Sequence, residues 1–385
     1  MHLIRNTVGL LALVSVTNLS ALSAFGQCPE GDCINRREPG SLLLFPEYQN
    51  GPGRATVVTV TNANCDSAGS VQVEFKYLNG ENCLEANESE DLTPCDTITL
   101  LTSQHTGLDK GYFYAFARSA TQNSTANPAG NPIVFNHLVG SQLVVNAWIS
   151  IDYSVNAVSF EAFGVEGTST DKDAPGLFPD ALGDGIRDLD GSEYERAPEK
   201  ILIPRFLGQD DVLQQRGLHS DLVLIALSGG RAFEANQVVP GGGTTILIHG
   251  WNDNEVMFSL EHTFDCWQKL RLGLLQSQDL VTPVPGTGAF DKDTLDDFNS
   301  DPNEIAGVNA EAGWFWINGV SASSSVETIM DPAVYAILIE NIRGHSAADL
   351  PFELCSQSNG DLIPSNIRGD YNGSVNPPFN SFDNQ

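Results

Sequence analysis

Basic residues are scarce in this chain. Its 385 residues include 19 lysines and arginines against 49 aspartates and glutamates, so the formal net charge is −30 at pH 7. A surface with that charge repels the phosphate backbone of nucleic acids and anionic lipid headgroups. The composition therefore argues against nucleic acid as a partner and predicts an acidic, soluble protein.

Long hydrophobic runs are missing as well. The apolar run from Val8 to Val16 is shorter than the roughly 20 residues that a membrane span needs. It follows a short basic start and precedes small residues that end at Ala24. This order predicts a secretory signal peptide over residues 1–27. No second span follows, so we expect a secreted or periplasmic protein with no membrane insertion.

No stretch shows the periodicity of a long amphipathic helix. Instead, short β-branched and aromatic runs alternate with Gly, Asn, Pro and Asp from Gly40 to Ala162. Runs of this length and spacing are typical of a β-sandwich or barrel. The chain is therefore predicted to be all-β.

The second half repeats the order of the first. Leu43–Pro46 matches Ile201–Pro204, Gly111–Tyr114 matches Gly313–Trp316, and Pro132–Phe135 matches Pro332–Tyr335. The offset between partners grows along the chain, which an insertion near 276–311 in the second copy explains. We therefore expect two tandem β-sandwich domains related by duplication, at 38–165 and 198–355. An acidic linker at 166–197 joins them, and a disordered tail follows at 356–385.

This organisation resembles the tandem immunoglobulin-like and fibronectin-III-like modules of exported bacterial proteins. The resemblance is architectural and covers both halves loosely. The Cys…Trp…Cys core spacing of true immunoglobulin domains is absent. The resemblance implies a fold and no particular activity.

All seven cysteines lie after the predicted signal peptide. Export would place them where disulfides form. Short loops suggest the pairs Cys28–Cys33 and Cys83–Cys95, and Cys266 and Cys355 are the natural partners in the second half. This scheme leaves Cys65 over, and three explanations stay open: Cys65 is free, it pairs with another chain, or the scheme itself is wrong.

The predicted linker carries the best candidate for a metal site. Calcium takes six to eight oxygen ligands, and closely spaced carboxylates around glycine supply them. The candidate ligands are Asp180, Asp184, Asp188, Asp190 and Glu193. The spacing departs from that of an EF-hand loop, and an acidic, solvated linker is the alternative. A second acidic cluster, from Asp291 to Asp301, lies in the inserted loop.

Three tryptophans form a candidate ligand surface. Trp314 and Trp316 share one face of their expected strand, with Phe315 on the other, and Tyr112 and Tyr114 hold the matching places in the first copy. If Phe315 fills the core, the tryptophan face with Trp251 is free to stack on sugar rings. The favoured interpretation is packing in the core or between domains.

A catalytic constellation is also lacking. Thr245–Trp251 resembles the strand and His-Gly turn of an α/β-hydrolase, and Gly344–Ala348 imitates its nucleophile elbow around Ser346. No histidine follows His345, however, and Pro351 prevents the helix that should follow the elbow. The remaining histidines are scattered, and His262 with Cys266 lacks companions for a metal site.

The sequence therefore predicts an exported, non-enzymatic structural or adhesive protein, with calcium as its one candidate cofactor. Its expected partner is an extracellular protein or a polysaccharide. A pair of carbohydrate-binding modules using Trp251, Trp314 and Trp316 is the alternative. A hydrolase using Ser346 is the remote one.

Overall fold

The computed structural model describes residues 38–119, 131–147, 151–170, 187, 189, 191, 193–198, 200–207, 218–227, 243–252, 255, 257–272, 275, 312–323, 328–330, 332–342 and 345–354. Their secondary structure is almost entirely antiparallel β-sheet, with one short helix, α1 (Thr102–His105). This confirms the predicted all-β class. No helix in this part of the chain has the length and apolar character that a membrane span requires.

The first half of the chain forms two sheets. Sheet A has the order β5 (Thr97–Leu101), β2 (Arg54–Asn62), β7 (Leu138–Asn146), β8 (Ile151–Asn156). Sheet B has the order β4 (Glu85–Leu92), β3 (Val71–Asn79), β6 (Lys110–Arg118), β1 (Leu42–Gln49), β9 (Val158–Phe160). Their facing sides share a core that includes Phe45, Val58, Val60 and Phe113, which are all buried.

The second half forms two sheets with the same order. Sheet C has the order β14 (Trp267–Arg271), β11 (Leu218–Ala226), β17 (Val334–Ile342), β18 (His345–Asp349). Sheet D has the order β13 (Met257–Phe264), β12 (Gly243–Asn252), β15 (Ala312–Ser323), β10 (Lys200–Leu207), β19 (Phe352–Leu354), and β16 (Thr328–Met330) pairs with the far end of β15.

The two halves also share local irregularities. The β1–β6 pairing shifts between Phe45 and Tyr48, and the β10–β15 pairing shifts at the matching place, between Ile203 and Phe206. After each irregularity a backbone N–H donates to a hydroxyl of the neighbouring sheet. Gln49 N lies 2.9 Å from Thr56 Oγ1, and Leu207 N lies 3.0 Å from Ser220 Oγ. The repeat in the sequence thus has a counterpart in pairing register and in individual hydrogen bonds.

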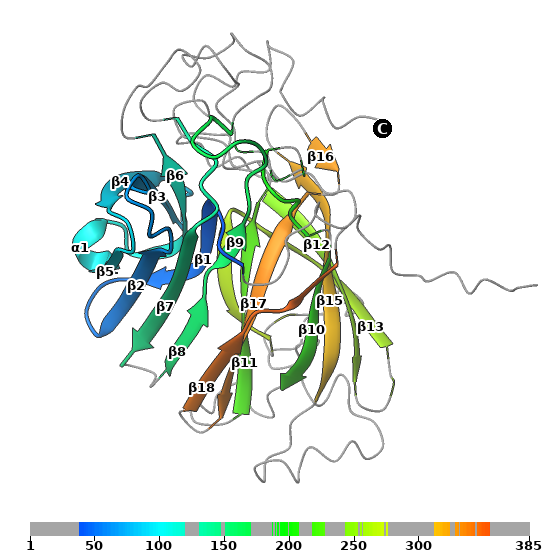
Figure 1. Cartoon of the computed structure of the whole chain (residues 1–385). Helices are drawn as coiled ribbons and strands as arrows, with labels where there is room; N and C mark the ends of the chain where they lie inside the picture. The colour runs from blue at the N-terminus through cyan, green and yellow to red at the C-terminus, as the bar shows by residue number, and fades with distance from the viewer. Residues whose placement is uncertain are drawn as a thin grey trace, which may run out of the picture.

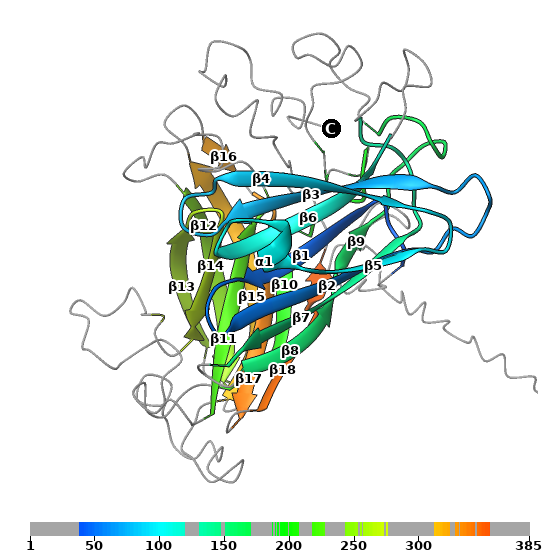
Figure 2. The same cartoon turned by 90° about the vertical axis from the view of Figure 1, so that its left-hand side faces the viewer.

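The predicted pair of tandem sandwich domains is nevertheless wrong. The four sheets are arranged as a four-bladed β-propeller (Figures 1 and 2). Strands β11 and β17 are buried on both faces along nearly their whole length, because sheet C packs against both halves. One hydrophobic cluster contains Tyr114 of sheet B, Leu224 of sheet C and Phe315 of sheet D. Strand alternation predicts two faces for a sheet, but it does not reveal which further sheet covers each face.

Between Arg187 and Ala197, most described residues of the expected linker are packed into this core rather than solvated. Leu189 and Tyr194 are fully buried. Tyr194 forms a β-bridge with Ala162, and the guanidinium of Arg187 lies 4.1 Å from the ring centroid of Phe116 on sheet B. The prediction of an acidic spacer between separate domains is therefore wrong for these residues, whose apolar contacts outweigh the acidic composition of the segment.

The disulfide pairing differs from the predicted scheme. Cys65 pairs with Cys95, with Cα atoms 4.7 Å apart, and Cys83 pairs with Cys266, with Cα atoms 5.9 Å apart. Strand β4 separates Cys83 from Cys95 and at about 3.4 Å per residue places them at opposite ends of an extended segment. The predicted pairs Cys83–Cys95 and Cys266–Cys355 are thus wrong, and Cys65 is not left over. Cys28, Cys33 and Cys355 lie outside the described residues.

The predicted signal peptide (1–27), the inserted loop (276–311) and the tail (356–385) also lie outside the described residues. These three assignments stay predictions.

Candidate functional site: the outer face of sheet D

Sheet D has one buried face and one outer face. Strand β15 lies between β12 and β10. In it, Phe315 and Ile317 are fully buried, whereas Trp314 is 37% exposed. In β12, Ile248 is buried, and His249 on the opposite face is only partly covered. Alternation along a strand sends successive side chains to opposite faces, so the tryptophans of these two strands gather on the outer face.

The three candidate tryptophans form one cluster there. Trp251 and Trp314 are paired across β12 and β15, and their rings stack with centroids 4.5 Å apart at an interplanar angle of 15°. Trp316 meets Trp251 edge-on, with centroids 5.7 Å apart, and His249 meets Trp316 in the same way at 5.8 Å. The ammonium of Lys200 lies 5.6 Å from the centroid of Trp316, within the range of a cation–π contact.

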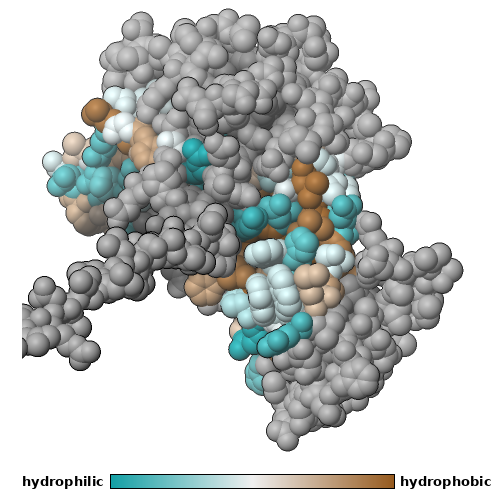
Figure 3. All heavy atoms as spheres, turned by 90° about the vertical axis from the view of Figure 1, so that its right-hand side faces the viewer, coloured by the Kyte–Doolittle hydropathy of each residue, from teal (hydrophilic) through white to brown (hydrophobic). Residues whose placement is uncertain are grey.

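Apolar side chains extend this cluster toward both edges of the sheet. Met257 on β13 lies opposite Trp251 and is 62% exposed. Leu202 on β10 lies between Trp316 and Phe352, and Phe352 on the edge strand β19 is 61% exposed. Figure 3 shows hydrophobic residues exposed between polar ones on the side of the molecule where sheet D lies. We call Leu202, His249, Trp251, Met257, Trp314, Trp316 and Phe352 the aromatic face.

The matching face of the first half is buried. Tyr114 is equivalent to Trp316. Tyr114 pairs with Leu44, the third residue of β1, and Trp316 pairs with Leu202, the third residue of β10. Tyr112, the counterpart of Trp314, is 2% exposed, and its hydroxyl donates to Ala226 O of sheet C at 3.4 Å. The packing interpretation thus holds for the tyrosines, while Trp314 faces solvent.

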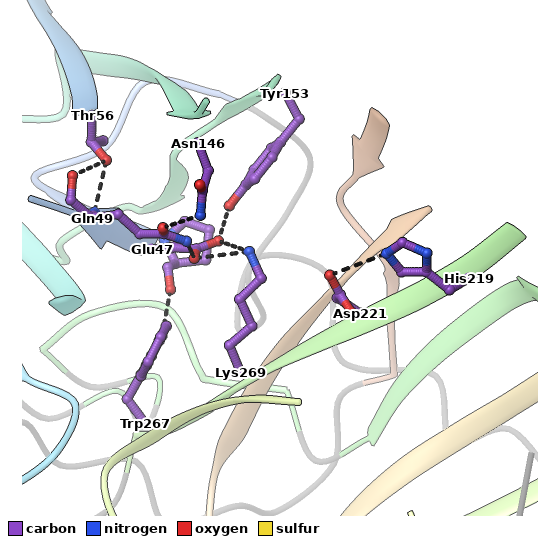
Figure 4. Close-up of polar contacts among 10 residues, drawn as sticks. Glu47, Gln49, Thr56, Asn146, Tyr153, His219, Asp221, Trp267 and Lys269 are labelled. Atoms are coloured by element: carbon purple, nitrogen blue, oxygen red, sulfur yellow. Dashed lines mark hydrogen bonds and ion pairs between the residues drawn. The ribbon is translucent and has the colours of Figure 1, made fainter. Parts of the chain in front are cut away.

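A separate cluster, made of polar and charged side chains, joins the two halves (Figure 4). Glu47 follows Pro46 in β1 and is completely buried. Lys269 on β14 places its Nζ 2.9 and 3.0 Å from the two carboxylate oxygens of Glu47, and the Tyr153 hydroxyl donates to the same carboxylate. Trp267 Nε1 donates to Pro46 O at 2.9 Å. Burial, together with the negative charge of Glu47, raises the pKa of Tyr153 well above its usual value.

This inter-half cluster is a structural element rather than an accessible site. Gln49 donates to Glu47 and accepts from Asn146 Nδ2 at 3.2 Å, so the carboxylate and its neighbours are bound on several sides. Nearby, Arg271 Nε lies 3.5 Å from Asp221 Oδ1, and Asp221 Oδ2 lies 3.8 Å from His219 Nε2. A buried carboxylate surrounded in this way is satisfied by the protein itself and has no room for a substrate.

Only one of the five predicted calcium ligands, Glu193, belongs to the described residues. Asp180, Asp184, Asp188 and Asp190 lie outside the described residues. Glu193 is 2% exposed, and its backbone oxygen accepts from Phe163 N at 2.8 Å. Among the described residues, no group of three or more His, Cys, Asp and Glu side chains is placed to hold a metal ion. The calcium hypothesis therefore stays a prediction.

The hydrolase-like motifs are ordinary strand segments. Thr245–Trp251 lies inside β12, between β13 and β15, and Ser346 lies inside β18, where Asn341 Nδ2 donates to its hydroxyl at 3.1 Å. No strand-to-helix turn places Ser346 as a nucleophile elbow would. Cys266 is disulfide-bonded, and His262 contacts Gln268 Oε1 at 2.6 Å, so this pair is not placed as metal ligands.

The sequence interpretation missed Phe352, Met257 and Lys200 as neighbours of the tryptophans. Phe352 lies in a three-residue strand that follows Pro351, and no periodicity is visible over so short a run. Its pairing with β10 brings it beside Leu202. No protein-family model matches the chain, and no curated protein sequence matches it either.

Proposed function

We propose that this chain is an exported, non-enzymatic binding protein that attaches to a neutral polysaccharide through the aromatic face. The observation that carries the proposal is the cluster of Trp251, Trp314 and Trp316 on the outer face of sheet D, where Trp314 is 37% exposed and the other two are partly buried. The equivalent residues of the first half, Tyr112 and Tyr114, are buried. A cluster of three tryptophans that reaches the solvent needs a reason other than packing in the core.

The chemistry of the aromatic face suits sugar rings. The face of an indole carries partial negative charge, which attracts the polarised C–H groups on the flat side of a pyranose. Lys200 and His249 lie against the aromatic rings and supply hydrogen-bonding groups for hydroxyls. Binding sites for small ligands combine these features, apolar contact area and a few placed polar groups.

The charge of the chain limits the classes of polysaccharide that it can bind. A net charge of −30 repels polyuronates and sulfated polymers, which leaves neutral glycans as the favoured class. Two disulfides support the predicted export, since such bonds persist in oxidising compartments. A flat sheet face encloses no reacting group, which favours binding over catalysis.

Tryptophan fluorescence tests this proposal directly. Titration with a neutral β-glucan, xylan or mannan should quench the emission and shift it, because rings exposed on the aromatic face become covered. Alginate serves as the anionic control and should give no change. If no neutral glycan quenches the emission or retards the protein in an affinity gel, the proposal is wrong, and a protein partner becomes the better explanation of an exposed apolar patch.

A further inference from the structure

A cleft lies beside the aromatic face, at the junction of the two halves. Its volume is about 790 Å³, and it is lined by β9 from the first half and by β10, β17, β18 and β19 with their connections from the second. Its walls are mainly apolar, with Val158, Ile203, Leu338 and Leu350 among them. The cleft is therefore large enough for one or two sugar rings, within the range of small-molecule sites.

Phe352 connects the cleft with the aromatic face. Its strand position lies opposite Leu202, which in turn lies opposite Trp316, so the three residues form one row across sheet D. The same Phe352 lines the cleft and remains 61% exposed. Phe352 is thus the member of the aromatic face that also belongs to the lining of the cleft.

The wall of the cleft contains an arginine, Arg205, that an ion pair holds in place. Arg205 Nε donates to Glu340 Oε1 at 2.8 Å, and Arg205 Nη2 donates to Glu340 Oε2, so the two planar groups are held in a bidentate pair. An arginine carries five N–H donors, and this pair uses two of them. The side chain of Arg205 is 67% exposed, which leaves its remaining donors accessible.

The charges of the cleft favour a neutral ligand. Its charged lining residues are Arg205, Glu340 and Glu353, one cation against two anions. Glu353 accepts a hydrogen bond from the Tyr335 hydroxyl at 2.7 Å. This excess of carboxylates disfavours an anionic ligand. Adjacent donors and acceptors instead suit vicinal hydroxyls, which donate and accept at neighbouring oxygens.

We infer that the cleft is a second subsite for the same neutral polysaccharide. Phe352 stacks on a sugar at the entrance, and the Arg205–Glu340 pair hydrogen-bonds to the hydroxyls of the sugar inside. The aromatic face stacks on sugar rings with little selectivity, and the cleft selects the glycan by the pattern of its hydroxyls. This inference rests on the proposed function, because it assigns to the cleft a further part of the same chain-like ligand.

Calorimetric titration of the full chain with the neutral glycan that quenches its fluorescence tests the inference. Arg205→Ala and Phe352→Ala should each raise the Kd at least fivefold, while the fluorescence quenching at saturation is retained because the tryptophans are intact. Leu143→Ala, which removes an exposed apolar side chain from sheet A, is the matched control and should leave the Kd unchanged. Thermal melting of each variant checks that the fold is preserved.

The outcomes separate the two proposals. If Trp316→Ala weakens binding while Arg205→Ala and Phe352→Ala bind like the wild type, the aromatic face binds alone and the cleft subsite is refuted. If the wild type binds no neutral glycan, the proposed function fails and the inference fails with it.

Discussion

Lys269 and Glu47 form a buried ion pair between the two halves of the chain, 222 positions apart in sequence. Lys269 Nζ lies 2.9 Å and 3.0 Å from the two oxygens of Glu47, whose side chain is fully buried. Two charges in a low-dielectric interior stabilise the fold only as a pair, because each alone carries a large desolvation cost. The pair thus fixes how sheet C meets sheet B.

Removal of Lys269 should destabilise the protein strongly. In Lys269→Met the carboxylate of Glu47 stays buried without its cation, and breaking a buried pair in this way costs about 3–5 kcal/mol. The free energy of unfolding in urea measures the effect. The double variant Glu47→Gln/Lys269→Met should recover much of the loss, since no unpaired charge remains. If the losses of stability in Glu47→Gln and Lys269→Met simply add up in the double variant, the ion pair does not couple the halves.

The Cys83–Cys266 disulfide should be the covalent link between the halves. It closes a segment with a sequence separation of 183 residues, whereas Cys65–Cys95 closes one of 30. Because the longer loop restricts the unfolded chain more, Cys83→Ser/Cys266→Ser should cost about 2–5 kcal/mol, and more than Cys65→Ser/Cys95→Ser. Equilibrium unfolding compares the two double variants. Mass spectrometry of non-reduced peptides that finds Cys83 joined to Cys95 would contradict the pairing.

Trp314 and Tyr112 are equivalent positions with opposite surroundings. Tyr112→Ala removes a buried ring from the contact between sheets B and C, so we expect a loss of about 3–5 kcal/mol. Trp314→Ala removes a partly exposed ring and should cost about 1 kcal/mol, within the range of a surface aromatic pair. Thermal unfolding of both variants measures the difference. Equal losses would mean that the outer face of sheet D is covered like its counterpart.

Acidification should lower the stability through His105. This side chain lies against Phe75 and contacts the Tyr77 hydroxyl at 2.8 Å through Nδ1. Burial lowers its pKa below the usual value, although Glu90 acts in the opposite direction. The unfolded chain therefore binds a proton at about pH 6.5 that the folded chain binds only at lower pH, so stability falls as the pH drops below that value.

The control for this titration is His105→Gln, which should flatten the pH dependence of stability between pH 7 and 5. Urea unfolding at several pH values provides the measurement. An unchanged slope in the variant would assign the pH dependence to other groups. Glu74 is not one of them: burial raises its pKa, but Lys76 and Arg118 outweigh this and hold it below the usual value of 4.5, so its stabilising effect is lost only at a pH below this range.

The strands and the internal repeat could be predicted from the sequence, because alternation and matched segments are local properties. The packing of the sheets could not. Tyr114 and Trp316 hold equivalent places and have similar chemistry, yet Tyr114 is 1% exposed and Trp316 lies partly exposed on the outer face. Likewise, Glu47 is one acid among 49 in the sequence, and only the approach of Lys269 from the other half sets it apart.

The most direct test of the account is a calorimetric comparison of the wild-type chain with the Trp251→Ala/Trp314→Ala/Trp316→Ala variant, titrated with the same neutral polysaccharide. The account predicts saturable binding to the wild type, loss of at least tenfold in affinity in the variant, and closely similar melting temperatures. Binding of equal strength in both proteins would contradict the assignment of the aromatic face as the binding surface.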